Sequence, residues 1–315
     1  MKILIIHPCK GFYGGAEEVV AQLHDYLKHP HLSWIVTKDA PSELLKDRRF
    51  YNSNSWLDFY KSAREEIRHA DVACCFNFPA TLATFPTRKP IVWYCNEPPE
   101  LFTSWKRKPL EAFNRWWVKQ SHMKCVVATK ADATRFQRLY KVAPSILPYG
   151  IDYDFWSAPS TTQRAKDLTI LQVGHSELFP EGNKVLGELV KTVPNVGILR
   201  LSGEPREQVR DAYHKAHILF HPVSSHGGFL APFEAMCAGL PVVASVNFAA
   251  ADLIRKAGML AALPTPDEYA KAILTIYRHY DNFSNSQLAK DFVKNNLTWQ
   301  RFGEGMLRIF EETLK

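Results

Sequence analysis

The chain has 315 residues, 46% of them hydrophobic and 23% charged, which is enough for two soluble domains with substantial cores. Its formal net charge of +7 and its pI near 9.0 favour anionic partners, and nucleotides, anionic lipid and nucleic acid all qualify. The six cysteines form neither a C-x-x-C pair nor a Cys/His cluster at zinc spacing, so we expect reduced thiols and no disulfide framework. No apolar run approaches the length of a transmembrane helix, and Ile3–Ile6 is too short for a signal-peptide core. We therefore expect a cytoplasmic protein, soluble or peripheral on a membrane.

Short apolar segments alternate with longer helix-like segments along the first half of the chain. The expected strands are 2–6, 33–37, 72–76, 91–94, 125–128 and 146–148, and the expected helices are 16–27 and 130–140. In the first helix Val19, Val20, Leu23 and Leu27 share one face. This β-α alternation predicts a parallel sheet that helices cover on both faces.

A second block of the same kind follows a polar, irregular stretch at 153–166, which we interpret as a linker. Its expected strands are 168–173, 197–201, 218–220 and 241–244, and its expected helices are 182–192, 207–214, 233–238 and 266–280. The sequence thus predicts two parallel-sheet α/β domains in succession. Ligands of such domains bind at the carboxyl ends of the strands.

The most informative segment of the second block is Gly227–Ser245. It contains a glycine-rich loop, a short helix that carries Glu234 near its start, a helix stop at Gly239-Leu240-Pro241 and a buried strand. A helix N-terminus attracts an anion, and a carboxylate beside it accepts hydrogen bonds from a pair of sugar hydroxyls. The segment therefore predicts a site for a ligand with phosphate and hydroxyl groups.

This segment closely resembles the donor-binding motif of retaining GT-B glycosyltransferases, especially glycosyltransferase family 4 (group 1), whose pattern is E-G-F-G-L-x-x-x-E-A-M-x-x-G-x-P-V. Glu234 matches the second Glu, whereas His226 stands at the first and Gly228-Phe229 appear in swapped order. The resemblance covers nearly the whole chain and implies two Rossmann-like domains that face a central cleft. It implies an N-terminal, acceptor-side domain at 1–155 and a C-terminal, nucleotide-sugar-binding domain at 156–296, with a C-terminal helix at 297–315 crossing back to the first. An ordinary capping helix of the second domain is the alternative.

Two further segments of the first domain resemble family motifs. Gly14 and Gly15 match the G-G-A-E loop, where backbone amides face donor and acceptor. Asn96 stands where the family often has a His that contacts the donor sugar; Asn orients a ligand but carries no proton at neutral pH. Glu97 is the ionisable group beside it. Pro148–Asp152, with the letters P-Y-G-I-D, resembles the P-N-G-V-D hinge loop.

In the second domain, the resemblance implies a grip on the donor diphosphate by two cations. His175 stands where the family has Arg, and Lys184 is the match for the second cation. Glu234 is expected to hold the ribose hydroxyls, and backbone amides at Phe229, Leu230 and Ala231 to complete the cradle. His226 is expected near the donor sugar, with Asn96 and Glu97.

These features predict a glycosyltransferase that moves a sugar from a UDP- or GDP-sugar to a glycan, a lipid-linked or a small-molecule acceptor, with retention. We expect neither a cofactor nor a metal, because the family needs no metal. The departures at Asn96, His175 and His226 leave two alternatives open: a non-catalytic or diverged nucleotide- or glycan-binding protein, and a GT-B sugar-nucleotide epimerase. A Rossmann oxidoreductase is disfavoured because neither domain carries the G-x-G-x-x-G fingerprint.

A basic, tryptophan-rich segment suits an anionic membrane interface on the inner face of the membrane. It comprises Trp105, Lys106, Arg107, Lys108, Arg115, Trp116, Trp117 and Lys119. The alternative is a helix whose tryptophans pack into the first domain. Nucleic-acid binding is not expected, because no recognised motif accompanies the charge.

Overall fold

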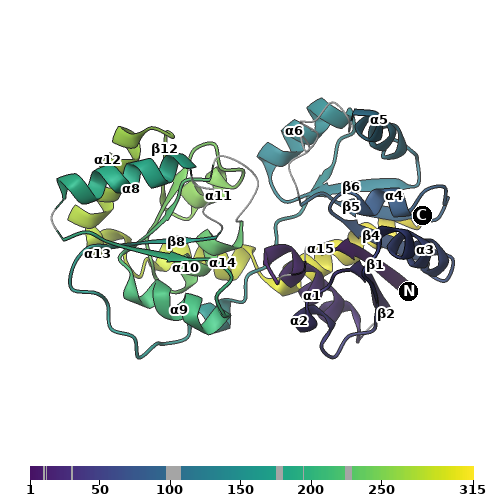
Figure 1. Cartoon of the computed structure of the whole chain (residues 1–315), viewed down its shortest axis with the longest axis horizontal. Coiled ribbons are helices and arrows are strands. Elements are labelled where there is room, and N and C mark those ends of the chain that lie inside the picture. Colours follow the sequence, from purple (N-terminus) through teal and green to yellow (C-terminus); the bar gives the residue numbers. More distant parts are fainter. Residues whose placement is uncertain are drawn as a thin grey trace. The chain divides into compact units, whose positions relative to one another are not determined.

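Two compact units, each built on a parallel sheet, make up the chain (Figure 1). The structure is a computed structural model that describes residues 1–9, 11, 13–29, 31–96, 108–174, 180–193, 195–223 and 229–315. The first unit comprises Met1–Gly150 and Trp299–Lys315, and the second Ile151–Thr298. The boundaries expected from the sequence were 155/156 and 296/297.

The first unit holds a seven-stranded sheet in the order β3-β2-β1-β4-β5-β6-β7, with every pairing parallel among the described strands. Its strands are β1 (Lys2–Pro8), β2 (Leu32–Lys38), β3 (Phe50–Ser53), β4 (Val72–Phe76), β5 (Ile91–Tyr94), β6 (Met123–Val127) and β7 (Ser145–Ile146). The five residues of β4 are all buried, as expected for a strand covered on both faces. The strand order reverses between β1 and β4, which is where open α/β sheets place their ligands.

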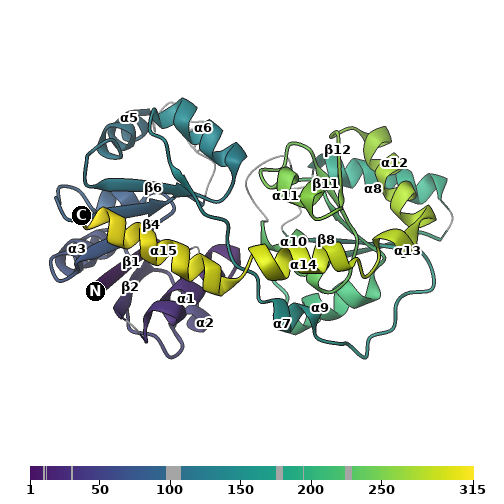
Figure 2. The same ribbon diagram turned by 180° about the vertical axis from the view of Figure 1, so that it is seen from behind.

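Helices cover both faces of this sheet. They are α1 (Gly15–Leu27), α2 (Ser42–Leu45), α3 (Trp56–Ile67), α4 (Ala80–Ala83), α5 (Lys108–Trp117), α6 (Lys130–Tyr140) and α15 (Trp299–Thr313). On one face Phe59, Trp117 and Phe136 from α3, α5 and α6 enter a core with Trp93 of β5. The next residue of β5, Tyr94, points to the other face, because side chains alternate along a strand. There α1 and α15 lie side by side (Figure 2).

The return of the C-terminal helix to the first unit confirms the expectation from the GT-B resemblance. Phe302 of α15 meets the ring of Tyr94, with centroids 5.7 Å apart. Gly303 lies directly against the ring of Tyr26 on α1, where a Cβ would overlap the ring. Gly150, where the chain leaves the first unit, lies equally close to the backbone of Trp299, where the chain returns to it. A Cβ on Gly150 would overlap that backbone, so this position requires glycine.

The second unit holds a five-stranded parallel sheet in the order β12-β11-β10-β8-β9. Its strands are β8 (Thr169–Val173), β9 (Gly197–Leu201), β10 (Ile218–His221), β11 (Val242–Ser245) and β12 (Leu260–Ala262). Its helices are α7 (Tyr153–Ser157), α8 (Pro180–Thr192), α9 (Arg206–Lys215), α10 (Leu230–Cys237), α11 (Ala251–Lys256), α12 (Pro266–Arg278), α13 (Tyr280–Phe283) and α14 (Gln287–Asn296). The order reverses between β8 and β10, so the residues after these two strands frame the ligand edge of this sheet.

The linker expected at 153–166 is wrong at its start. Residues Tyr153–Ser157 form α7, whose first turn is capped by Asp152 Oδ1 accepting from the Phe155 amide at 3.3 Å. Trp156 is buried against Tyr213, with ring centroids 5.6 Å apart. This short helix is held by an aromatic contact with a distant helix, which local polarity does not reveal.

All six cysteines are free and buried, in agreement with the expectation of reduced thiols. In the part of the chain that the structure describes, no helix is long and apolar enough to cross a membrane.

Candidate donor-binding site

The glycine loop after β1 opens α1 at the ligand edge of the first unit. Gly14 is the N-cap of α1, in an extended conformation, and Gly15 is its exposed first residue. The Gly14 amide donates to Glu17 Oε2 at 3.0 Å in a capping box. Because Gly14 already donates to Glu17, the amide groups left for a ligand are those of Gly15 and Ala16 in the first turn.

A buried polar cluster of His7, Cys9 and Glu17 stabilises this loop. Glu17 Oε1 pairs with His7 Nε2 at 3.1 Å, and both residues are buried. Burial disfavours the imidazolium, but hydrogen bonds with Cys9 and Glu17 outweigh it and raise the pKa of His7 to about 9. The same ion pair lowers the pKa of Glu17 against the opposing effect of burial. His7 and Glu17 therefore form an ion pair at neutral pH that ties the end of β1 to the start of α1.

His7, Cys9 and Glu17 each offer one metal-ligand atom within 4.8 Å of the others. Both carboxylate oxygens of Glu17 are already used, one by His7 and one by the Gly14 amide. Cys9 Sγ lies 3.2 Å from the Thr37 hydroxyl. The cluster is thus explained by internal hydrogen bonds that brace the glycine loop.

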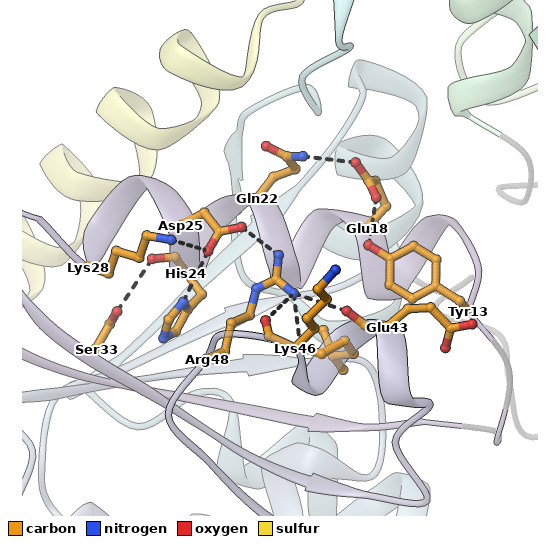
Figure 3. Close-up of polar contacts among 11 residues, drawn as sticks. Tyr13, Glu18, Gln22, His24, Asp25, Lys28, Ser33, Glu43, Lys46 and Arg48 are labelled. Carbon is orange, nitrogen blue, oxygen red and sulfur yellow. Dashed lines mark hydrogen bonds and ion pairs between the residues drawn. The ribbon is translucent and has the colours of Figure 1, made fainter. Parts of the chain in front are cut away.

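Further contacts fix α1 behind the loop (Figure 3). Tyr13 donates to Glu18 at 2.6 Å, and Gln22 donates to the other oxygen of the same carboxylate at 3.0 Å. At the far end of the helix, Asp25 accepts from Lys28 at 3.1 Å and from Arg48 at 2.5 Å. The helix that presents Gly15 is therefore anchored along its length to the surrounding loops.

Asn96 follows β5 at the same edge of the sheet and is half-buried. Its Oδ1 accepts from the hydroxyl of Tyr149 at 2.6 Å. Its Nδ2 is shielded from water and has no hydrogen-bond partner among the residues that the structure describes. Tyr149 is itself buried and lies against Tyr94, with ring centroids 5.3 Å apart. Asn96 thus presents a fixed, unused N–H donor.

In the second unit, Gly182 near the start of α8 lies in close contact with Pro222, the residue after β10. A Cβ on Gly182 would overlap the ring of Pro222, so only glycine allows this approach. Lys184 lies two residues further along α8, exposed and without an ion-pair partner among the described residues. The close contact at Gly182 therefore holds Lys184 beside the ligand edge formed by β8 and β10.

A second cation, Arg200, contacts the residue before Lys184 on α8. Arg200 of β9 donates to Asn183 Oδ1 at 3.3 Å and to Gln172 Oε1 at 3.1 Å. Gln172 is buried on β8, and no described residue hydrogen-bonds to its Nε2. The described part of this edge therefore offers one cation fixed by two amides, Arg200, and one free cation, Lys184.

Glu234 occupies the second turn of α10, because this helix begins at Leu230 and not at Phe233 as the sequence suggested. Its Oε2 accepts from the buried hydroxyl of Tyr213 at 3.1 Å, and the same hydroxyl lies 3.3 Å from the Ala231 carbonyl. Burial and the Glu234 carboxylate hold the pKa of Tyr213 well above its usual value. The hydroxyl therefore stays protonated and donates a hydrogen bond to Glu234. Tyr213 thereby fixes the Glu234 carboxylate.

The first turn of α10 contains the expected cradle residues. Phe229 is the N-cap and packs on Phe233, with ring centroids 5.0 Å apart. The amides of Leu230 and Ala231 have no acceptor within the helix, because they belong to its first turn. The stop after α10 is as predicted: Gly239 adopts a φ of 77°, and a Cβ there would overlap the Asn285 side chain.

The basic, tryptophan-rich segment divides in the structure. Trp117 is buried, and its Nε1 donates to Thr84 Oγ1 at 2.8 Å, so its expected membrane contact is wrong. Arg115 pairs with Glu111. Trp116 is 51% exposed on the same helix, and Lys108 and Lys119 are also exposed.

Six of the predicted residues lie outside the described residues. They are Glu97, His175, His226, Trp105, Lys106 and Arg107. Sequence reasoning missed the roles of Tyr149, Tyr213 and Arg200, which contact Asn96, Glu234 and the neighbour of Lys184, and of Gln172, which contacts Arg200. The signal available for Tyr149 was its departure from Asn in the P-N-G-V-D pattern.

Comparison with known proteins agrees with this geometry. Residues 149–279 match the model of the family described as Glycosyl transferases group 1. A comparison with curated proteins found no match. This match confirms the group 1 resemblance for the segment that carries Lys184, Tyr213 and Glu234.

Solved structures align over both units. A glycosyltransferase from Rickettsia africae ESF-5 aligns with a TM-score of 0.75 over 100% of this chain and 98% of its own, at 17% identity. Alr3699/HepE of Anabaena, solved with UDP and glucose, aligns with a TM-score of 0.76 over 99% of each chain, at 15% identity. Sucrose-phosphate synthase from Thermosynechococcus elongatus aligns with a TM-score of 0.78 over 99% of each chain, at 12% identity. The chain therefore has the two-domain GT-B fold.

Proposed function

We propose that this protein is a glycosyltransferase that moves a sugar from a nucleoside-diphosphate sugar to a glycan, lipid-linked or small-molecule acceptor. The observation that carries the proposal is the Glu234 carboxylate on α10, which Tyr213 of α9 holds by a hydrogen bond, within the segment that matches the group 1 family. The two oxygens of one carboxylate suit two adjacent ribose hydroxyls. HepE of Anabaena, which has the same fold, was solved with UDP and glucose, and this supports a uridine nucleotide as the first donor to test.

The diphosphate of the donor would meet positive charge on the second unit. Lys184 is free to contact it, and Arg200 lies beside Lys184 through Asn183. Departure of the nucleoside diphosphate develops negative charge on the leaving oxygen, and preorganised cations and amides lower that barrier. His175 is proposed to share this role. We expect this chemistry to need no metal.

The first unit would supply orientation. The amides of Gly15 and Ala16 and the Asn96 side chain are the ligand-facing donors that its described residues offer. Glu97 and His226 are proposed to lie near the reacting sugar. With no proton carried by Asn96, transfer would depend on alignment of the acceptor with the anomeric carbon, which we expect to keep its configuration.

We further propose that the protein docks on the anionic inner face of a membrane to reach a lipid-linked acceptor. The support is the exposed side of α5, where Trp116 and Leu110 are 51% and 44% exposed beside Lys108 and Lys119. An indole at headgroup depth and neighbouring cations suit such a surface, at ~1 kcal/mol for each cation.

The direct test is calorimetry without added metal against UDP, GDP, ADP and their common sugars. We expect one nucleoside diphosphate to bind, and Glu234→Ala to weaken it by roughly 1.5–3 kcal/mol, as for hydrogen bonds to a charged group. Asp267→Ala, which removes an exposed carboxylate at the start of α12 in the same unit, is the matched control. Unchanged affinity in Glu234→Ala would remove this residue from the site.

Product analysis separates the alternatives. Release of nucleoside diphosphate with a glycosylated acceptor supports transfer, whereas a changed sugar on an intact nucleotide would indicate an epimerase. Binding without any turnover would indicate a non-catalytic protein on the GT-B fold. Loss of all nucleotide binding would overturn the proposal itself.

A further inference from the structure

Two positions that depart from the family motifs contact each other in the first unit. Asn96 stands where the family often has His, and Tyr149 stands where the hinge motif has Asn. The hydroxyl of Tyr149 donates to Asn96 Oδ1 at 2.6 Å. This hydrogen bond joins the two departures within one unit.

The environment of Tyr149 defines the direction of this hydrogen bond. Burial holds the pKa of the Tyr149 hydroxyl well above its usual value, with the charges of Asp132 and Cys95 adding to the effect. The hydroxyl therefore stays protonated and needs an acceptor. With Oδ1 of Asn96 turned toward Tyr149, the amide nitrogen faces the other way.

The nitrogen of Asn96 is the group left over. Nδ2 is shielded from water and finds no acceptor within the described part of the chain, and a buried donor without an acceptor costs about 1–3 kcal/mol. Asn96 lies two residues after β5, at the carboxyl edge of the sheet, where α/β proteins bind ligands. An acceptor oxygen from a ligand would satisfy this donor.

We infer that Tyr149 is a positioning residue that holds Oδ1 of Asn96, so that Asn96 Nδ2 donates to an oxygen of the donor sugar. The inference rests on the proposed function and specifies how it selects its sugar. A fixed N–H donor requires an acceptor oxygen at one position of the sugar and disfavours a deoxy sugar there. Tyr149 itself does not touch the ligand.

The test compares UDP-glucose with UDP by calorimetry in wild type, Tyr149→Phe, Asn96→Ala and the double variant. We expect Tyr149→Phe to weaken UDP-glucose about fivefold, as for loss of one hydrogen bond, and to leave UDP unchanged. In the Asn96→Ala background, Tyr149→Phe should have no further effect, because its action passes through Asn96. If the donor screen selects another base, its diphosphate and glucose conjugate replace these two probes.

A matched control lies in the same unit. Asn114 Nδ2 contacts the buried hydroxyl of Tyr140 at 3.5 Å, so Tyr140→Phe removes a comparable hydroxyl from a second Asn–Tyr pair. It should change neither affinity. Asn96→Asp keeps an oxygen toward Tyr149 but removes the N–H donor, and should weaken UDP-glucose at least as much as Asn96→Ala.

Each remaining outcome overturns the inference. An unchanged UDP-glucose affinity in Tyr149→Phe removes Tyr149 from the site. If Tyr149→Phe lowers the UDP-glucose affinity equally in the wild-type and Asn96→Ala backgrounds, Tyr149 has a structural role that does not depend on Asn96. A wild-type protein that binds UDP but gains nothing from the sugar refutes the inference and leaves the nucleotide site intact. A wild-type protein that binds no nucleotide refutes the proposed function, and the inference with it.

Discussion

The buried His7–Glu17 pair predicts a specific dependence of stability on pH. Folding raises the pKa of His7 from 6.5 to about 9, so its contribution to stability is complete below pH 6.5 and is lost as the pH rises through about 9. Folding lowers the pKa of Glu17 below its ordinary 4.5, so its contribution is present above that pH and is lost on acidification. The pair therefore stabilises the protein most between pH 4.5 and pH 6.5.

The expected size of the alkaline loss follows from the same pKa values. A difference of one in pKa corresponds to about 1.4 kcal/mol. The interval from 6.5 to about 9 thus amounts to a loss on the order of 3 kcal/mol in the free energy of unfolding. Total stabilities of ~5–15 kcal/mol make this loss large enough to measure.

Urea unfolding at a series of pH values from about 6 to about 9.5 measures this loss directly. His7→Gln should be less stable than wild type near pH 6 and should approach it near pH 9, because the variant has no imidazolium to lose. His69→Gln removes an exposed histidine from the same unit and should keep the wild-type pH dependence. If His7→Gln and wild type lose stability in parallel over this range, His7 is not charged in the folded protein and the reasoning fails.

Three further variants, two of them paired with a control variant, test other contacts. Tyr213→Phe should weaken nucleoside-diphosphate binding about three- to tenfold in calorimetry, because the Glu234 carboxylate loses the hydroxyl that fixes it. Equal affinity of wild type and variant would show that Glu234 needs no support from Tyr213. Gly239→Ala should lower the free energy of unfolding by ~1–3 kcal/mol through its φ of 77° and the overlap of its Cβ, whereas Gly187→Ala, with open space in α8, should raise it by about 0.5–1 kcal/mol. Trp116→Ala should reduce binding to anionic liposomes in a sedimentation assay and Trp56→Ala on α3 should not; equal binding of both variants would argue against docking through α5.

Elements with a strong local pattern were predictable from the sequence. The bounds expected for the strands at 72–76, 91–94 and 197–201 and for the helix at 130–140 are those of β4, β5, β9 and α6. Each of these strands is a short run of mostly apolar residues, and α6 starts at a Thr cap whose hydroxyl accepts from Asp132 at 3.1 Å. The glycine stop after α10 was equally readable because its φ requires glycine.

Elements stabilised mainly by distant contacts were not predictable. The edge strand β3 has no buried residue, so its segment shows no apolar pattern. The helix α3, with Trp56 and Leu57 exposed at its start, presents an interrupted apolar face. The buried state of Trp117 depends on Thr84 from another helix, which sequence spacing cannot indicate. Local sequence therefore identified the strands around the site but not the residues packed behind it.

One carboxylate in each unit and the Asn96 amide of the first unit share one physical arrangement. Glu17 is held by His7, Glu234 by Tyr213 and Asn96 by Tyr149, and each partner is buried in its own unit. The loop that Glu17 braces and the side chains of Glu234 and Asn96 are therefore fixed before a ligand binds, so less conformational entropy would be lost on binding. Asn96, which departs from the family motif, is held by Tyr149 just as Glu234 is held by Tyr213. This arrangement favours the hypothesis that Asn at this position changes the sugar preference over the hypothesis that the site has been lost. A Tyr149→Phe variant that loses discrimination between sugars while it keeps nucleotide affinity would establish this distinction.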